Sequence, residues 1–286
     1  MTLPSHLTTL QTPDGARIAV SLHGGHLCAW RSADGVERLF LSDRTRWNDV
    51  IAGIASIRGG IPIVFPQFAG MGPLPKHGLV RTVRWTLLEA TPETGLMRLG
   101  VTDSAATAQF DGRFSLEIQL RFSGLQLSID LIITNTGEQP FAFTAALHSY
   151  LATPIDTTRI DGLQGQPYLD CAVEPRTPCG GTDTALTVTQ EVDRIYAALA
   201  TPVTLTNPMG ALSVRQSGFE DVVVWNPWAE KAAALPDLMP HDERQFVCIE
   251  AALIHHPHTL LPGQSWQGQQ QLCATPHFAT AQGATP

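Results

Sequence analysis

The chain has 286 residues, of which 43% are hydrophobic and 15% charged, and its formal net charge is −8. An acidic balance argues against nucleic acid or an anionic membrane as the main partner, because both require clustered surface cations. No apolar run approaches the ~20 residues that span a bilayer, and the first residues lack the pattern of a signal peptide. Five cysteines without a CxxC spacing indicate free thiols in a reducing compartment, so we expect a cytoplasmic protein.

The first predicted elements are short strands followed by a long irregular loop. Residues 16–30 alternate weakly and break at Gly24-Gly25, which predicts two strands joined by a turn or bulge. We assign no structure to residues 36–49. The segment 56–85 holds five glycines and four prolines, which disfavour a helix, but it also holds large apolar residues. An apolar loop of this kind usually lies against the floor of a binding cleft.

The charges of this glycine-rich loop all have one sign. No Asp or Glu occurs between Asp49 and Glu89. The charged residues of the loop are Arg58, Lys76, Arg81 and Arg84. In an otherwise acidic chain, such a group of cations without acids to pair with predicts a pocket that holds an anion.

The rest of the chain has the pattern of strands. Residues 114–122 alternate with period two, and a second such run over 125–131 follows a turn at Gly124, which predicts a hairpin. Asn135-Thr136-Gly137 is the next turn, and residues 154–182 are typical of loops between short strands. Further strands are expected at Val83–Ala90, Phe141–Leu147, Arg194–Ala198, Val203–Thr206, Leu212–Arg215, Asp221–Trp225, Phe246–Ala251 and Ser265–Leu272.

One short helix is expected over Pro227–Leu235, with Asn226 as its cap and Pro227 at the first helical position. The tail from His277 is small and polar, and we expect it to be frayed over 277–286. No repeat or linker divides the chain, so we expect one domain over 1–286 with a motif-bearing core at about 16–274. Many short strands at spacings of about ten residues favour an all-β fold, one large β-sandwich.

Polar residues stand at several positions where a strand pattern would not place them. Glu250, among apolar neighbours, is either exposed on a strand or held in an apolar site that raises its pKa towards a general base. His148, at a strand end, is either a structural hydrogen-bonding residue or an acid–base group. Asp193 beside Arg194 is by itself typical of a surface ion pair that contributes little.

Six motifs in a fixed order give these residues a context. They are RGGIPIVFPQF, KHGLVRTVRW, LHSYL, VDRIYA, VVVWNPWAEKA and FVCIEAA. Over roughly residues 53–252 their order resembles the hexose-6-phosphate mutarotase (glucose-6-phosphate 1-epimerase) branch of the aldose 1-epimerase superfamily. The resemblance implies a galactose-mutarotase-like supersandwich, a hexose 6-phosphate as substrate, no metal and no organic cofactor. It leaves the preferred hexose and the oligomeric state open, and we take a monomer as the default.

The resemblance also implies an acid–base pair. Glu250 in CIE corresponds to the general base of the family, and His148 in HSY to its general acid. Interconversion of anomers requires one proton to leave the C1 hydroxyl while another reaches the ring oxygen O5. We expect the two groups on opposite sides of the C1–O5 unit, with Glu250 taking the hydroxyl proton and the His148 imidazolium protonating O5. The open chain then turns about C1–C2 and recloses with the roles reversed.

Substrate-binding residues follow from the same resemblance. Arg58 and Arg81 correspond to residues that contact the substrate, and we assign them to its phosphate, which guanidinium groups bind in bidentate fashion. Asp193 corresponds to a carboxylate that binds sugar hydroxyls, and His77 to a histidine near the sugar ring. Lys76 stands where the family has a small or amide residue, and it either adds to phosphate binding or is a solvated lysine at the rim.

The loop also departs from the family at Ala69, which intervenes before Gly70 and leaves the path of the chain open. Trp225, Trp228 and Trp266 either stack on a sugar or lie in the core.

Three alternatives stay open from the residues. An aldose 1-epimerase acting on unphosphorylated hexoses is disfavoured by the cations of RGG and VRT. A carbohydrate-binding protein without catalysis is disfavoured by the acid–base pair. A metal site at His255-His256-Pro257-His258 is disfavoured by the proline and by the lack of a companion Cys or Asp cluster, so we expect a solvent-facing loop there.

Overall fold

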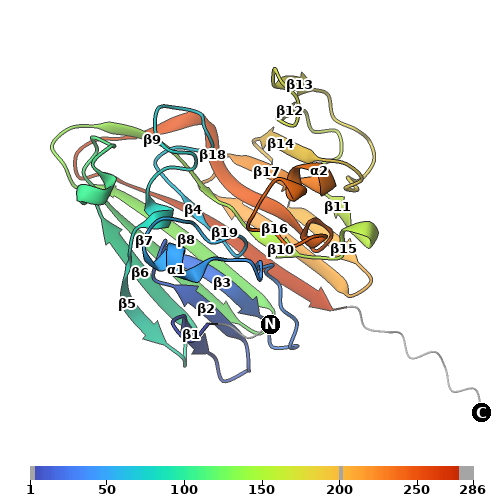
Figure 1. The fold of residues 1–286 in the computed structure, drawn as a ribbon, viewed down its shortest axis with the longest axis horizontal. Helices are drawn as coiled ribbons and strands as arrows, with labels where there is room; N and C mark the ends of the chain where they lie inside the picture. Colours follow the sequence, from blue (N-terminus) through green and yellow to red (C-terminus); the bar gives the residue numbers. More distant parts are fainter. Residues whose placement is uncertain (1–3, 200–201, 277–286) are drawn as a thin grey trace, which may run out of the picture.

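A computed structural model describes residues 4–199 and 202–276, and in it the chain is built almost entirely of β-strands (Figure 1). The predicted frayed tail, 277–286, lies outside these residues. The predicted all-β sandwich is confirmed: the strands within the described residues form two eight-stranded sheets and one three-stranded sheet. None of the helices within the described ranges has the length and apolar character needed to cross a membrane.

The first large sheet has the strand order β13-β12-β14-β17-β18-β9-β4, with β10 paired to β18. Its strands are β4 (Ile63–Val64), β9 (Phe141–Leu147), β10 (Tyr150–Ala152), β12 (Tyr168–Asp170), β13 (Thr177–Cys179), β14 (Val192–Ala197), β17 (Asp221–Asn226) and β18 (Phe246–Leu260). The pairings of these strands are antiparallel.

The second large sheet has the order β11-β15-β16-β19-β8-β7-β6-β5. Its strands are β5 (Thr86–Thr91), β6 (Leu96–Thr102), β7 (Phe114–Ser123), β8 (Gln126–Asn135), β11 (Arg159–Asp161), β15 (Val203–Asn207), β16 (Gly210–Ser217) and β19 (Ser265–Pro276). The small sheet contains β1 (Thr8–Gln11), β2 (Arg17–Ser21) and β3 (His26–Arg31). The short helices are α1 (Trp47–Ile51), η1 (Val80–Thr82), η2 (Ala105–Thr107), η3 (Ile155–Thr157), α2 (Trp228–Ala233) and η4 (Asp242–Arg244).

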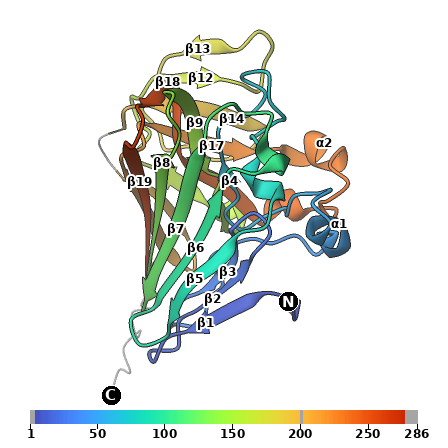
Figure 2. The same ribbon diagram turned by 90° about the vertical axis from the view of Figure 1, so that its left-hand side faces the viewer.

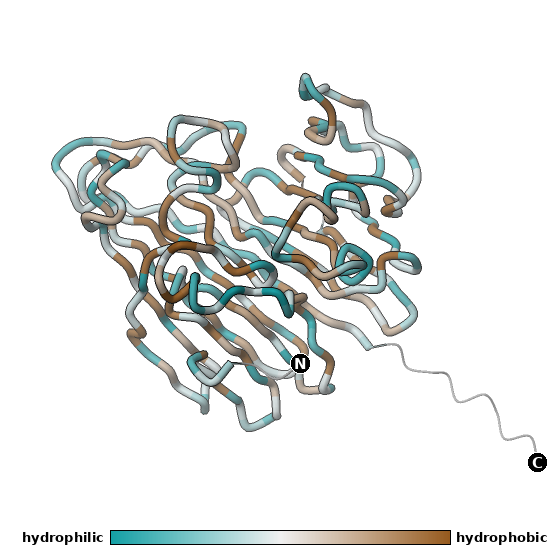
Figure 3. The backbone as a smooth tube through the Cα atoms, in the orientation of Figure 1, coloured by the Kyte–Doolittle hydropathy of each residue, from teal (hydrophilic) through white to brown (hydrophobic). Residues whose placement is uncertain are grey.

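The two large sheets lie face to face and enclose the main core (Figure 2). The period-two pattern of the sequence sets its contents: Leu116 and Ile118 of β7 are fully buried, as are Val224 of β17 and Val247 of β18. Each such side chain contributes about 1.5–3 kcal/mol when it leaves water. Hydrophobic residues accordingly recur along the strands, with more hydrophilic residues in the connecting loops (Figure 3).

The hairpin of β7 and β8 is confirmed, with Ser123 opposite Gln126 and Gly124 in the left-handed region at φ 53°. The predicted strand over 83–90 begins later, at Thr86, because residues 80–82 form the turn η1. The predicted helix is shorter than expected, since α2 begins at Trp228. Pro227 is its N-cap residue rather than its first helical residue, and the side chain of Asn226, the expected cap, accepts a hydrogen bond from the Trp228 N–H at 2.8 Å.

The prediction of a loop at His255–His258 is wrong, because β18 continues through these residues to Leu260. The three histidines are solvent-facing, as expected, but they contact different partners. His255 Nδ1 lies 2.7 Å from Asp221 Oδ1, His256 Nδ1 lies 3.5 Å from Glu220 Oε2, and the His258 ring packs beside Phe143. They therefore do not converge on one point.

One face of the first sheet points away from the main core, and loops cover it. Along β18, Ile249 and Ala251 join the main core, whereas Glu250 and its neighbours at positions two residues away point to the other face. Phe68 of the glycine-rich loop packs on one part of this face and Leu238, after α2, on another. The loops and this face, which we call the site face, form the surroundings of the candidate site.

Candidate active site

Four neighbouring strands place a row of side chains on the site face. Asp193 of β14 lies opposite Trp225 of β17, Trp225 opposite Cys248 of β18, and Cys248 opposite Tyr150 of β10. Glu250 follows two residues after Cys248, so it projects from the same face. The antiparallel register thus gathers residues that are far apart in the sequence.

His148 joins this row from the end of β9. Its backbone N–H donates to the Pro62 carbonyl at 3.0 Å, and its Nε2 lies 3.3 Å from Glu250 Oε1. The imidazole stacks on the Tyr150 ring with centroids 4.9 Å apart, and the Trp225 ring meets it edge to face at 5.8 Å. Aromatic packing on two sides fixes the ring that touches Glu250.

The two groups lie side by side, which differs from the expected arrangement on opposite sides of the C1–O5 unit. A contact of 3.3 Å leaves no room for a sugar between them. O1 and O5 are bonded to the same carbon, so two adjacent side chains reach both oxygens from one side. The arrangement is thus suited to exchange protons with two neighbouring oxygens.

Burial opposes charge on both partners. Glu250 is 1% exposed, and burial, assisted by Asp193 and opposed by Lys76, raises its pKa well above the usual value. Burial also lowers the pKa of His148 well below 6.5, and His77 and the two nearby arginines lower it further. These directions favour one proton on the pair, a carboxylic acid beside a neutral imidazole. Proton transfer across the contact gives a carboxylate and an imidazolium with the same proton count.

A buried amide holds the residues next to the pair. Gln270 of β19, which is fully buried, accepts a hydrogen bond from Ser149 Oγ at 2.5 Å and donates to the Ile249 carbonyl at 3.0 Å. The Ile249 N–H in turn donates to the Ser149 carbonyl at 3.1 Å. Ser149 follows His148 and Ile249 precedes Glu250, so one side chain of the second sheet contacts the neighbours of both members of the pair.

Arg58 brings the first cation to the site. Its Nη1 donates to Tyr150 Oη at 2.9 Å, and its Nη2 lies 3.1 Å from Asp237 Oδ2. The expectation that these arginines lack acidic partners is therefore wrong for Arg58, because the acid comes from outside the glycine-rich loop. Arg81 Nη2 donates to the Lys76 carbonyl at 2.7 Å, and Tyr150 and Asp237 are among the groups that act electrostatically on it.

The path of the glycine-rich loop past Ala69 is fixed by hydrogen bonds. Gln67 Nε2 donates to the Ala69 and Leu74 carbonyls at 3.2 and 2.9 Å, and its Oε1 accepts from Leu74 N–H at 2.9 Å. The His77 N–H donates to the Ala69 carbonyl at 3.0 Å. Ala69 and His77 both adopt positive φ, 47° and 65°. These hydrogen bonds close the loop on itself and fix the backbone next to Lys76.

Lys76 and His77 stand at the point where the loop closes. The His77 ring lies 5.4 Å from the His148 ring, and burial followed by the cations Arg81, Lys76 and Arg58 lowers the pKa of His77 to about 3. His77 is therefore neutral near pH 7. Lys76 is exposed, and partial desolvation together with Lys231 lowers its pKa while Asp193 raises it.

Asp193 faces the site and Arg194 does not. Burial raises the pKa of Asp193, Glu191 raises it further, and Lys231 and Lys76 oppose the shift. The Arg194 guanidinium lies 4.3 Å from the centre of the Tyr168 ring. Successive residues of a strand point to opposite faces, so the interpretation of these two residues as a surface ion pair is wrong.

Unpartnered polar atoms gather at this site. Among the described residues, seven buried side-chain nitrogen or oxygen atoms have no hydrogen-bond partner, and five of them belong to the site. They are Arg58 Nε, His77 Nδ1, His148 Nδ1, Asp237 Oδ1 and Glu250 Oε2. Native proteins rarely leave buried polar atoms unpaired, so such a concentration marks a place where a polar ligand supplies the missing partners.

The same site holds the grouping of potential metal ligands found in the described residues. One ligand atom each from His148, Cys248 and Glu250 lie within 4.8 Å of one another. A metal requires the thiol and the carboxyl to be deprotonated, and burial raises the pKa of both Cys248 and Glu250 well above their usual values. The electrostatics thus suit proton exchange better than metal binding.

Three residues of the site were not predicted as such. Tyr150 stands two residues after His148 at the start of a strand, and Trp225 was considered either a sugar platform or core. The strand register places Tyr150 and Trp225 beside His148, whereas Trp266 lies in the main core. Asp237 lies in a segment without a motif, and nothing in the sequence connects it to Arg58.

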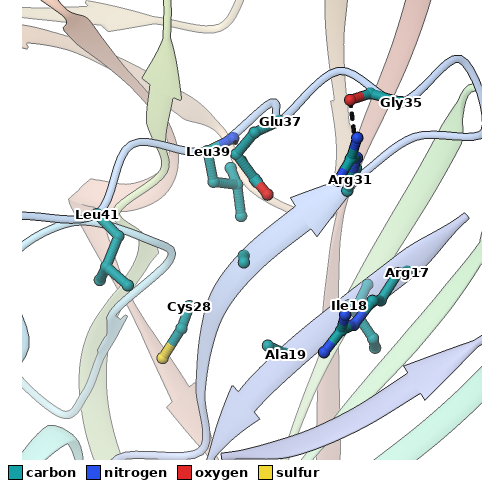
Figure 4. Close-up of a pocket in the computed structure, with 10 residues that line it drawn as sticks. Arg17, Ile18, Ala19, Cys28, Arg31, Gly35, Glu37, Leu39 and Leu41 are labelled. Atoms are coloured by element: carbon teal, nitrogen blue, oxygen red, sulfur yellow. Dashed lines mark hydrogen bonds between the residues drawn. The ribbon is translucent and has the colours of Figure 1, made fainter. Parts of the chain in front are cut away.

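A separate hollow of about 490 Å³ lies against β2 and β3 (Figure 4). Its charged lining residues are Arg17, Arg31 and Glu37. Glu37 Oε1 already accepts from the Trp30 and Leu39 N–H groups at 2.8 and 3.3 Å, and Arg31 Nε donates to the Gly35 carbonyl at 2.8 Å. These contacts organise the local backbone, and the hollow shares no lining residue with the candidate site.

Solved structures identify the class of fold. The chain superposes on YeaD from Salmonella typhimurium, described as "a putative mutarotase", with a TM-score of 0.85, 24% identity and coverage of 96% of this chain and 92% of that one. Slr1438 from Synechocystis sp. PCC 6803 superposes with a TM-score of 0.78 and 20% identity over 97% and 100% of the two chains. The architecture is that of the galactose-mutarotase-like sandwiches.

Sequence comparison identifies the family. A family model for aldose 1-epimerase matches residues 6–273. A Cenchrus ciliaris protein named "Putative glucose-6-phosphate 1-epimerase" is 32% identical over 273 residues, 90% of this chain and 81% of the relative. An Escherichia coli protein of the same name is 29% identical over 82% of this chain and 79% of its own length. The chain therefore belongs to the aldose 1-epimerase family of isomerases, as the six motifs predicted.

Proposed function

We propose that the protein interconverts the α and β anomers of a hexose 6-phosphate of the glucose 6-phosphate type. The observation that carries this proposal is the 3.3 Å contact between His148 Nε2 and Glu250 Oε1 next to a group of cations. The names of the curated relatives, glucose-6-phosphate 1-epimerase, support the same substrate class.

The acid–base pair opens and closes the sugar ring. In its carboxylate–imidazolium form, Glu250 takes the proton of the C1 hydroxyl while His148 gives a proton to O5, which breaks the C1–O5 bond and leaves an aldehyde. Rotation about C1–C2 turns the other face of the aldehyde towards O5. His148 then takes the O5 proton, O5 attacks C1, and Glu250 returns a proton to O1. One proton remains on the pair throughout, so each turnover ends in the starting state.

Arg58 and Arg81 bind the 6-phosphate, and Lys76 adds a third positive charge. Guanidinium groups suit phosphate because their planar array of donors forms paired, charge-assisted hydrogen bonds. The unpartnered Nε of Arg58 is one such donor. Because the phosphate is bound at C6, the other end of the sugar, C1, is held and oriented next to the acid–base pair.

Asp193 and His77 complete the sugar site. Asp193 accepts hydrogen bonds from ring hydroxyls. His77, neutral at pH 7, offers an unpartnered Nδ1 without competing for the proton of the pair. Trp225 lies against His148 and offers its ring as an apolar surface for the sugar.

We also propose that the protein acts in the cytoplasm, as a monomer. All five cysteines lie within the described residues and all five are free thiols. Free thiols persist in reducing compartments, which supports this location.

A comparison of two sugars tests the proposed substrate. Anomer exchange is measured by NMR for glucose 6-phosphate and for glucose, with wild-type protein and with Arg81→Ala. Each charge-assisted hydrogen bond is worth about 1.5–3 kcal/mol, so we expect kcat/KM to be at least about 100-fold higher for the phosphorylated sugar. Arg81→Ala is expected to raise KM about tenfold for glucose 6-phosphate only.

Two results would contradict the proposal. Equal kcat/KM for both sugars would indicate an aldose 1-epimerase of unphosphorylated hexoses. Binding of either sugar without accelerated exchange would indicate a carbohydrate-binding protein.

A further inference from the structure

Asp237 lies in the segment between α2 and η4, and this segment is fixed against the site. The next residue, Leu238, is 2% exposed and packs in a small core with Phe40, Tyr150 and Phe246. An aspartate followed by a residue anchored in this way has little freedom to move. Its carboxylate is therefore held in front of the site before any ligand arrives.

A second connection joins this segment to the loop of Arg58. Asp242 Oδ2 accepts from the Met239 N–H at 2.8 Å and from Ser42 Oγ at 3.3 Å. The Ser42 N–H donates to the Arg58 carbonyl at 3.0 Å. The backbones that carry Asp237 and Arg58 are thus tied together independently of the ion pair between their side chains.

The ion pair occupies only part of the Arg58 guanidinium. A guanidinium has five N–H donors. One Nη1 donor reaches Tyr150 Oη and one Nη2 donor reaches Asp237 Oδ2, while the buried Nε has no partner. The side chains of Arg58 and Asp237 are 22% and 26% exposed, so water does not replace the pair easily. Tyr150 and Asp237 therefore contact two nitrogens of the Arg58 guanidinium, and its other N–H donors stay available to a ligand.

Asp237 also balances charge in the site. It acts electrostatically on Arg81 as well as on Arg58, and these two cations repel each other. Asp193 and Glu250 also lie on the site face, and the proposed reaction needs them for the sugar and for proton transfer. A separate acid keeps the arginines together without engaging either group.

We propose that Asp237 is a positioning residue that orients Arg58 so that its free donors meet the phosphate of the substrate. This inference rests on the proposed function, because it assigns a role within the same site. Asp237 prepares the anion site in advance, which lowers the cost of ordering a long side chain when the substrate binds. Asp237 itself exchanges no proton with the substrate.

A double-mutant cycle tests this role. KM and kcat for glucose 6-phosphate are measured for wild type, Asp237→Asn, Arg58→Gln and the double variant. We expect Asp237→Asn to raise KM about tenfold and to change kcat less than about twofold. In the Arg58→Gln background the same change is expected to have no further effect, because the residue acts through Arg58. Asp237→Glu is expected to restore part of the affinity.

A matched control removes a different carboxylate. Asp156 is 66% exposed and pairs with Arg244 of η4, so Asp156→Asn makes the same chemical change outside the site and should leave KM unaltered. Thermal unfolding of each variant shows whether the fold is retained. If Asp237→Asn unfolds, Asp237→Glu provides the measurement, with a KM between those of wild type and Arg58→Gln.

Three outcomes would overturn the role of Asp237. Additive effects of the two substitutions would show that it acts apart from Arg58. A lower KM in Asp237→Asn would show that it competes with phosphate, and an unchanged KM would show that it is dispensable. The proposed function is judged separately on the wild type: equal kcat/KM values for glucose 6-phosphate and glucose would contradict it, whatever the variants do.

Discussion

At the scale of single residues, the site combines cations with two groups whose charge is suppressed by burial. Glu250 is nearly inaccessible and His148 is 9% exposed, yet they touch each other beside Arg58 and Arg81. Burying an ionisable carboxyl costs stability, and proteins accept that cost mainly where the group has a function. In the proposed mechanism the pair therefore links activity to stability, and a substitution can separate the two.

Glu250→Gln is expected to lower kcat for anomer exchange by about 10²–10⁴-fold, since an amide neither takes nor gives the required proton. The difference in stability between wild type and this variant should also depend on pH. The pKa of Glu250 is raised in the folded state, so the unfolded chain ionises first above about pH 4.5. Wild-type stability relative to Glu250→Gln therefore falls with rising pH, by up to about 1.4 kcal/mol per unit, until the folded-state pKa is passed.

Urea unfolding over a series of pH values measures this difference, and polarimetry measures the exchange. Glu138→Gln, at an exposed position, is the control for the loss of one carboxyl group. Parallel stability curves for wild type and Glu250→Gln would show that burial does not shift the pKa of Glu250. Normal exchange by the variant would remove Glu250 from the mechanism.

The residues of the site were predictable to different degrees. His148 and Glu250 stand out because each is a polar residue in an apolar strand context, and strand register brings them together. Arg58 and Arg81 stand out by charge in a segment without acids. Asp237 could not be predicted, because its pairing depends on how the segment after α2 folds back, and no local pattern encodes that.

At the scale of elements, β18 supports the site and contains its main irregularity. Its pairing with β9 shifts register between Leu253 and His258, a few residues after Glu250. Asp221 of β17 stabilises this region from one side: its Oδ2 accepts from the Ile254 and His255 N–H groups at 2.6 and 3.0 Å. Pro257 falls inside the irregular part, where its missing N–H costs no ladder bond.

Asp221→Ala is expected to destabilise the fold by about 2–4 kcal/mol, because it leaves two backbone donors of β18 without an acceptor in a buried place. Asp221→Asn keeps one side-chain oxygen and should cost clearly less. Guanidinium unfolding of both variants measures the difference. Equal destabilisation by Ala and Asn would show that the acceptor role of Asp221 is not what matters.

The strands themselves were the most predictable elements. Period-two alternation over 114–131 predicted the hairpin of β7 and β8, and turn residues predicted where most strands begin or end. The length of β18 was missed because His255-His256-Pro257-His258 is polar and contains a proline, a pattern typical of a loop. These residues form a strand because Asp221 and β9 supply partners that a local pattern does not reveal.

At the scale of the whole molecule, the two large sheets and the small sheet bury two of the five thiols completely. Cys28 and Cys248 are inaccessible, and burial raises the pKa of Cys28 to about 12. The other three, Cys171, Cys179 and Cys273, are partly exposed. Thiolate formation and access both control the reactivity of cysteine.

A disulfide reagent is therefore expected to modify at most three thiols in the native protein and all five after unfolding in guanidinium. Cys171 should be the slow one of the three, since burial raises its pKa to about 11. Absorbance of the released thiolate counts the modified groups. Five fast-reacting thiols in the native state would contradict the closed packing of β3 and β18.

Gln270 has a consequence for how the protein fails when heated. Its side-chain amide, which comes from the second large sheet, bonds to Ser149 beside His148 and to Ile249 beside Glu250. Separation of the two large sheets would break both hydrogen bonds of Gln270 and release the residues next to His148 and Glu250. We therefore expect activity to be lost at the temperature at which the sandwich unfolds, without an inactive folded state at lower temperature.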